Sequence, residues 1–240
     1  MTYVGDETTI EGLFPLDDGS PSSRSPSPIL RRKLFRRFFS TAGLAVSGVA
    51  LTAVFGQKAY AQIGVRTSLS QQLKLVQRHE NDHVAFLVGA LGALARPKPT
   101  FQNLTSPNLS AFLTAGRVFE NVGVGAYLGA APVLLSRAFL AAAGSIATIE
   151  SRHAGFFNSL QSIAVTQNAF GDDQSFDRAF TAAEVVAFAG PYVASLNGGP
   201  PLAYDSTPSA SNDIQILNFA LALEYLEAEY YNINVPRFYP

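Results

Sequence analysis

Residues 80–83 read Glu-Asn-Asp-His, and residues 150–153 read Glu-Ser-Arg-His. Each Glu-x-x-His pair interrupts an otherwise apolar stripe at helical spacing. The first stripe continues through Leu69, Leu73, Val76, Leu87 and Ala90, and the second through Phe139, Ala143, Ile146, Phe157 and Leu160. The two stripes match position for position at an offset of 70 residues. Because an apolar stripe of this period faces the core of a helical protein, both pairs are expected to be buried.

A second repeat relates two further segments at an offset of 104 residues. It matches Leu113, Glu120 and Tyr127 with Leu217, Glu224 and Tyr231. The pattern predicts helices over 67–94, 109–128, 136–160 and 213–231, with Pro236 marking the end of the last. The connection 162–212 is expected to be a covering loop with a short helix at 182–189. The fold class is therefore all-α, a four-helix bundle with an internal two-fold repeat.

Four buried carboxylates need positive compensation, and no Lys or Arg lies on these stripes. A pair of divalent cations would supply it. One Glu from each of two helices and Glu-x-x-His from each of the other two is the arrangement of dinuclear carboxylate sites. The expected ligands are Glu80, His83, Glu120, Glu150, His153 and Glu224, with Glu227 as an alternative to Glu224. This oxygen-rich donor set with two imidazoles predicts two Fe or Mn ions.

Composition excludes several other classes of protein. The 240 residues contain no cysteine, which excludes iron–sulfur clusters, Cys-based zinc sites and thiol nucleophiles. Lys and Arg number 17 against 18 Asp and Glu, so the sequence offers no basic face for nucleic acid. No phosphate-binding loop or Ser-His-Asp set is visible. The triplet Gly123-Val124-Gly125 falls inside a predicted helix and is interpreted as a place of close backbone packing.

The N-terminal part has the features of an export signal. A basic cluster at 31–37 precedes an uncharged stretch at 38–57, and Ala59-Tyr60-Ala61 follows. Arg36-Arg37-Phe38-Phe39 resembles a twin-arginine signal. This predicts a signal over 1–61, a mature bundle over 62–240 and a periplasmic or extracellular location. The alternative is a retained membrane anchor, so contact with the membrane is either transient or through that anchor.

The motifs also resemble a known family. The segments His79-Glu80-x-x-His83-Val84, Ile149-Glu150-x-Arg152-His153-Ala154 and Leu223-Glu224-Tyr225-Leu226-Glu227 are similar to ferritin-like bacterial exported proteins and plant desiccation-related proteins. The resemblance covers residues 70–231 and implies a ferritin-like bundle with a dinuclear site. In that family the Leu-Glu-Tyr-Leu-Glu helix comes first, whereas here it is last. Three explanations stay open: a circular permutation, a fragment of a tandem array, or a three-helix unit completed by another chain.

Two functions are compatible with this reading. One is an oxidoreductase that uses the metals on O2, peroxide or ferrous ion. The other is a non-enzymatic stress-protective bundle whose metals are structural. Tyr127 and Tyr231 are expected either to donate hydrogen bonds near the metals or to serve as core aromatics. His79 lies off the stripe and is expected at the surface or beside a ligand, and the sequence is compatible with an oligomer.

Overall fold

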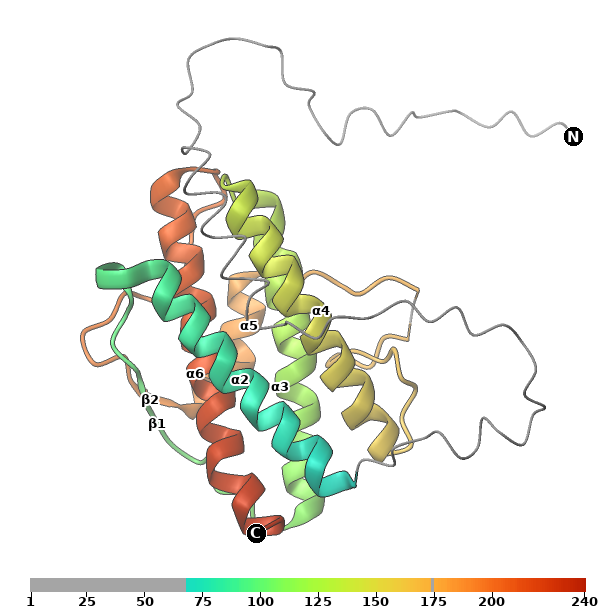
Figure 1. Ribbon diagram of the computed structural model, residues 1–240. Helices are drawn as coiled ribbons and strands as arrows, with labels where there is room; N and C mark the ends of the chain where they lie inside the picture. Colours follow the sequence, from blue (N-terminus) through green and yellow to red (C-terminus); the bar gives the residue numbers. More distant parts are fainter. Residues whose placement is uncertain (1–67, 174) are drawn as a thin grey trace, which may run out of the picture. The chain divides into compact units, whose positions relative to one another are not determined.

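A computed structural model describes residues 68–173 and 175–240, and the predicted signal lies outside them. Four long helices dominate this part of the chain (Figure 1). They are α2 (Leu69–Leu91), α3 (Leu109–Ala130), α4 (Arg137–Leu160) and α6 (Ala210–Phe238). The predicted all-α bundle is confirmed. Among the helices of the described residues, none combines the length and the hydropathy that a membrane crossing requires.

Short elements connect the long helices. The connection after α2 holds η2 (Gly92–Leu94) and β1 (Thr100–Phe101), and η3 (Ala131–Val133) joins α3 to α4. The connection after α4 holds α5 (Ala182–Ala189), η4 (Gly190–Tyr192) and β2 (Val193–Ser195). Strand β2 pairs antiparallel with β1, which ties the two long connections together.

Each long helix begins at a residue whose side chain can cap it. The side chains of Ser68, Asn108, Ser136 and Ser209 each accept a hydrogen bond from the backbone N–H three residues later. Such a cap satisfies one of the N–H groups that a helix leaves unpaired. Helix α2 ends at Gly92, whose φ of 57° is easily adopted only by a residue without a side chain.

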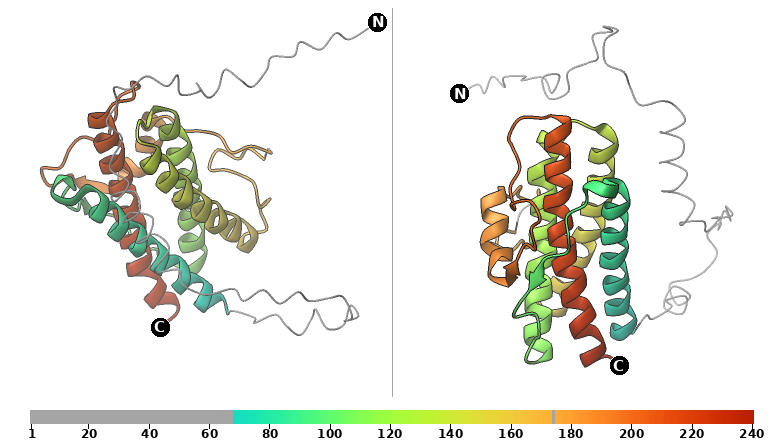
Figure 2. Two further views of the ribbon diagram at one scale, coloured as in Figure 1. Left: turned by 45° about the horizontal axis from the view of Figure 1, so that its top comes forward. Right: turned by 90° about the vertical axis from the view of Figure 1, so that its left-hand side faces the viewer.

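The helices pack in the order α2, α6, α3, α4. Helices α2 and α3 run in one direction, and α4 and α6 run in the other (Figures 1 and 2). Helices α3 and α6 are central, so every residue of 119–127 and of 216–224 is buried. The two Glu-x-x-His helices, α2 and α4, therefore flank the two helices that carry single glutamates.

The connection from α2 to α3 must return along the bundle because these helices are parallel. Buried asparagines of α6 hold it in place. Asn218 accepts a hydrogen bond from the backbone N–H of Arg96 (2.6 Å), and Asn234 accepts one from that of Ser106 (2.9 Å). These asparagines are 16 residues apart in the sequence, which is about 24 Å along a helix. The connection thus follows most of the length of α6.

The connection from α4 to α6 was predicted to be a covering loop with a short helix, and in the structure its helix α5 lies against α3. Helix α5 packs against α3, and the backbone N–H of Phe180 donates to the carbonyl of Gly125 (2.9 Å). A side chain at Gly125 would collide with the Phe180 ring, and one at Gly129 would collide with its backbone carbonyl. Close packing therefore requires glycine at these two positions.

The prediction that Pro236 marks the end of the last helix was wrong. Helix α6 starts at Ala210, earlier than predicted, and continues through Pro236 to Phe238. Proline disrupts a helix by removing one N–H and by crowding the carbonyl four residues before it. Here only the final turn is affected, and it retains a hydrogen bond from the N–H of Tyr239 to the carbonyl of Val235 (2.8 Å).

Candidate metal centre

The structure brings six of the seven predicted ligands together in the middle of the bundle. Their donor atoms form two groups, and within each group all donor atoms lie within 4.8 Å of one another. One group contains Glu80, His83, Glu150 and Glu224, and the other contains Glu80, Glu120, Glu150 and His153. Glu80 and Glu150 belong to both. Each group adds one histidine and one glutamate that it does not share.

Helix geometry explains why these residues meet. Positions i and i+3 lie on one face of a helix, so each Glu-x-x-His pair points both side chains to the same place. Helices α2 and α4 supply the two pairs, and α3 and α6 each supply one glutamate. All four glutamates are at most 2% exposed.

Each of the two predicted ligand histidines has one ring nitrogen surrounded by carboxylates. His83 Nδ1 lies 3.0 Å from Glu80 Oε2, 3.2 Å from Glu150 Oε1 and 3.2 Å from Glu224 Oε2. A ring nitrogen carries at most one proton, so hydrogen bonding cannot satisfy three carboxylates at once. Two donor atoms bound at right angles, each about 2.1 Å from one metal, are about 3.0 Å apart. The spacing therefore suits ligands of a shared cation.

The second histidine has the same surroundings. His153 Nδ1 lies 3.0 Å from Glu80 Oε1 and 3.0 Å from Glu120 Oε2. Despite these short distances, Glu80 Oε1 and both carboxylate oxygens of Glu150 have no aligned hydrogen-bond donor. Glu80 of α2 and Glu150 of α4, which both donor groups share, are thus the buried carboxylates of the described residues that keep oxygens without a hydrogen-bond donor.

Among the described residues, no lysine or arginine forms an ion pair with these carboxylates. Within the described part of the chain, the ion pairs of Lys or Arg are Lys98–Glu229 and Arg178–Glu184, at partly exposed positions. Burying an uncompensated carboxylate costs several kcal/mol. The orphaned oxygens, the spacing of the donor atoms around the histidines and the lack of a Lys or Arg partner among the described residues are all compatible with a metal-binding site at this place.

Burial and the crowding of carboxylates favour the protonated forms of several groups in this site. Burial raises the pKa of Glu80 and of Glu150, and the neighbouring glutamates raise both further. Burial acts to lower the pKa of His153, but Glu120 and Glu80 outweigh it and raise this pKa to about 11. The same holds for His83, because Glu224 and the other nearby glutamates outweigh burial and raise the pKa of His83. Metal ions would therefore displace protons from this site.

Two buried tyrosines hold the unshared glutamates. Tyr127 of α3 donates to Glu224 Oε1 (2.5 Å), and Tyr231 of α6 donates to Glu120 Oε1 (2.6 Å). Each tyrosine thus binds the glutamate of the opposite helix and leaves the other oxygen of that carboxylate near a histidine. Burial raises the pKa of both phenols, and the glutamate that each tyrosine contacts raises it further. Both tyrosines therefore remain protonated hydrogen-bond donors. The two predicted roles coincide, because these tyrosines are core aromatics and hydrogen-bond donors at once.

His79 contacts one ligand histidine from the outside. Its Nδ1 lies 3.0 Å from His153 Nε2, and the two rings stack at 5.2 Å with an angle of 9°. If His153 Nδ1 binds a metal, Nε2 carries the proton and donates it to His79. Such a partner fixes the tautomer and the orientation of a ligand histidine. The prediction that His79 lies beside a ligand agrees with this geometry.

Glu227 lies close to both groups but in neither. It is 4% exposed, and burial and the nearby Glu120 and Glu224 raise its pKa well above the usual range. The facing residue on α3 is Gly123, where a Cβ would lie 2.6 Å from Glu150 Oε2 and 3.4 Å from Glu227 Oε1. Gly123 thus makes room for carboxylates. The sequence-based interpretation of this glycine as a place of close backbone packing does not include this role. Making room for carboxylates depends on how α4 faces α3, which spacing along one helix does not reveal.

Comparison with known protein families gives one match, to the ferritin-like domain, over residues 47–162. Searches among curated proteins and solved structures give no match. Residues 47–162 therefore match a ferritin-like domain, and the helical bundle with its buried Glu and His residues points to the same class of protein. The match begins inside the predicted signal and ends after α4, so α6 lies outside it. That the helix order is a permutation of the family order stays a prediction.

Proposed function

We propose that this protein is an exported ferritin-like metalloprotein with a dinuclear Fe or Mn centre that reacts with O2, peroxide or ferrous ion. The observation that carries the proposal is the pair of donor groups sharing Glu80 and Glu150. Two overlapping groups, each completed by its own histidine and glutamate, match two adjacent ions bridged by carboxylates. Redox-active metals held in such a pair would supply electrons to an oxygen species bound beside them.

Charge supports two ions rather than one. The four glutamates of the two groups carry four negative charges when ionised, and two divalent cations carry four positive charges. Glu227 stands outside both groups and is not counted among these four. Neutrality in a buried site avoids the cost of an unpaired charge.

The protein groups around the site have separate tasks. Tyr127 and Tyr231 orient the unshared glutamates, and His79 orients His153. The layers on either side of the site are apolar and limit the access of water, which strengthens the electrostatic interactions within it.

Metal titration of the purified full chain tests the proposal. We expect two Mn(II) or Fe(II) ions per chain. Glu80→Gln should remove both, because Glu80 belongs to both groups, whereas Glu224→Gln and Glu120→Gln should each weaken one. Glu227→Gln is the matched control, one turn from Glu224 on the same helix, and should retain both ions. A wild-type chain without metal, or a Glu80→Gln variant that keeps two ions, would refute the dinuclear site.

Turnover separates an enzyme from a structural bundle. The metal-loaded protein is mixed with O2 or with H2O2, and the oxidation state of the metal is followed by absorbance. Repeated oxidation and re-reduction supports the oxidoreductase. Metals that raise the melting temperature but never change oxidation state would instead support the non-enzymatic alternative.

The exported location has its own test. The proposal rests on the basic cluster at 31–37, the uncharged stretch at 38–57 and Ala59-Tyr60-Ala61. N-terminal sequencing of the protein recovered from its compartment should begin at Gln62. Recovery with an intact Met1 would refute cleavage and favour the retained anchor.

A further inference from the structure

An apolar cavity of about 30 Å³ lies directly beside the metal centre. Its wall includes residues one helical turn from a ligand: Leu87 follows His83 by four positions, and Ile146 precedes Glu150 by four. Ala220 precedes Glu224 by four, in the same way. Tyr127 belongs both to the wall and to the site, because its ring lines the cavity and its hydroxyl donates to Glu224.

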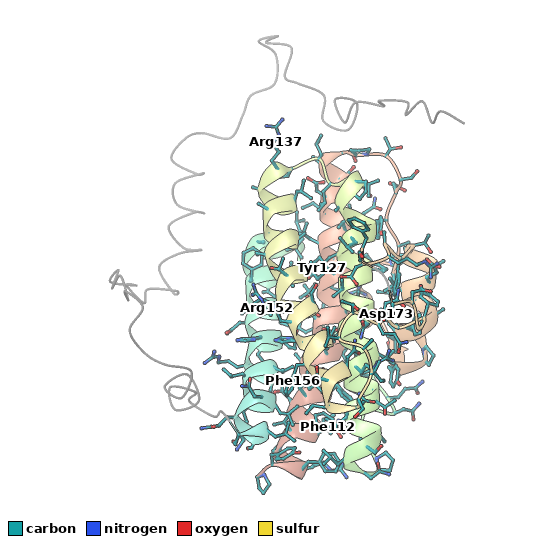
Figure 3. All side chains as sticks on the ribbon, turned by 90° about the vertical axis from the view of Figure 1, so that its right-hand side faces the viewer. Phe112, Tyr127, Arg137, Arg152, Phe156 and Asp173 are labelled. Carbon is teal, nitrogen blue, oxygen red and sulfur yellow. The ribbon has the colours of Figure 1, made fainter. Side chains whose placement is uncertain are left out.

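The internal repeat shows that this cavity is specific to one end of the bundle. The offsets of 70 and 104 residues pair every wall position with a position at the opposite end. Large residues at that end, Leu73, Phe112, Phe157 and Tyr230, correspond to Ala143, Ile216, Leu87 and Ala126 in the cavity wall. The four large residues are at most 1% exposed and pack against one another. Figure 3 shows the two ends, with Tyr127 in the upper half of the bundle and Phe112 near its lower end.

Four pairs run the other way, because the wall residues Phe139, Ile146, Phe219 and Ala220 are larger than their partners Leu69, Val76, Ala115 and Gly116. A Cβ at Gly116 would lie 3.0 Å from the Phe157 ring, so the opposite end has no spare space even for a methyl group. The cavity therefore lies where Ala143 and Ala126 stand in place of the much larger Leu73 and Tyr230, at one end of a repeat whose other end is filled. Its size is not a consequence of the bundle geometry that both ends share.

The wall selects the kind of molecule that the cavity can take. Every lining side chain except Tyr127 is a hydrocarbon, and the Tyr127 hydroxyl is already bonded to Glu224. A buried water needs two to four polar partners, which this wall does not offer, and about 30 Å³ accommodates roughly two water-sized spheres. Hydrogen peroxide and a hydrated cation would both lose hydrogen bonds on entry. A small apolar molecule would lose none.

We propose that this cavity binds dioxygen and holds it beside the metal pair. The inference rests on the proposed function for its use, and it narrows the substrate from O2, peroxide or ferrous ion to O2. Three wall residues, Phe86 and the α4 residues Phe139 and Ala143, are half-buried, whereas the rest of the wall is buried. The entrance is therefore on the side of the bundle formed by α2 and α4.

Binding is tested in the metal-free full chain with O2 itself as the probe. Dissolved O2 is paramagnetic and accelerates the relaxation of methyl groups that it contacts. The Ile146 and Leu87 methyls in the wall should relax several-fold faster under O2, and Val76 and Leu73, in the layer at the opposite end, should not. Val76 is the matched control for Ile146, since the repeat pairs these positions. Equal effects at both ends would overturn the inference.

Use of the cavity is tested in the Fe(II)-loaded protein. Ala143→Leu fills the cavity with the side chain that the repeat has at the paired position, Leu73. Ala126→Val is a second variant that fills less of the cavity. Each should slow oxidation by O2 about tenfold and leave oxidation by H2O2 within twofold. Ala141→Leu, on the exposed face of α4, is the control and should change neither rate. Circular dichroism and metal content show whether each variant is folded and loaded.

The outcomes distinguish this inference from the proposed function. If two Fe(II) ions bind but O2 does not reach the wall methyls, or if filling slows O2 and H2O2 alike, the cavity inference is wrong and the metal centre stands. If no metal binds, the proposed function fails, whether or not the relaxation measurement shows O2 in the cavity.

Discussion

Gly123→Ala tests the metal centre without removing any ligand. The added methyl group would lie 2.6 Å from Glu150 Oε2, whereas ordinary contacts of this kind begin near 3.4 Å. The carboxylate must therefore move by about 0.8 Å, and metal–ligand distances tolerate only about 0.2 Å. Because Glu150 belongs to both donor groups, both ions should bind less tightly. We expect a loss of affinity of about 10- to 100-fold, as for other disturbances around a metal ligand.

The same substitution should hardly disturb the metal-free fold. Alanine in a helix is favoured over glycine by about 0.5–1 kcal/mol, which offsets the cost of turning the Glu150 side chain away. Calorimetric titration with Mn(II) measures the affinity, and urea unfolding measures the stability. Gly89→Ala and Gly144→Ala are controls in open space that should raise the free energy of unfolding by about 0.5–1 kcal/mol and leave metal binding unchanged. A Gly123→Ala protein that binds two ions with wild-type affinity would refute the site geometry.

Four further predictions concern the groups around the ions and the pH dependence of metal binding and stability. Tyr127→Phe should lower the affinity for the ion of the Glu224 group about tenfold, and Tyr231→Phe should do the same for the ion of the Glu120 group. Competition with a chelator measures both affinities. His79→Ala should lower the affinity only for the ion bound by His153. Loss of both ions together would contradict a role of His79 limited to its contact with His153. Affinity should rise with pH, because the raised pKa values mean that binding releases protons, which titration in buffers of different ionisation enthalpy detects. The sign is opposite for the stability of the metal-free protein, which should fall as pH rises from about 4.5, since the folded state binds more protons than the unfolded state.

The helices and the ligand positions could be predicted from the sequence because both depend on local spacing. A Glu-x-x-His pair on an apolar stripe is buried in any helix that packs through that stripe, whatever its partners are. The role of Gly123 and the contact of His79 with His153 depend on which helix faces which, and spacing along one helix does not contain that information. The same holds for Asn218 and Asn234, whose side chains bind the long connection from α2 to α3. The end of α6 was mispredicted because a proline in a final turn removes few hydrogen bonds.

The internal repeat accounts for the proposed metal centre, and the positions where the repeat is broken account for the chemistry proposed beside it. A two-fold arrangement of ligands produces two equivalent metal positions, so by itself it gives no reason for a substrate to approach from one end. The positions around the ligands break this equivalence, with Ala126 and Leu87 at one end where Tyr230 and Phe157 stand at the other. His79 adds a second difference, since a hydrogen-bonding partner of this kind contacts His153. A substrate held in the cavity would meet the centre from the side of Tyr127 and Glu224, and the two metal positions would then differ in reactivity although their ligands are alike.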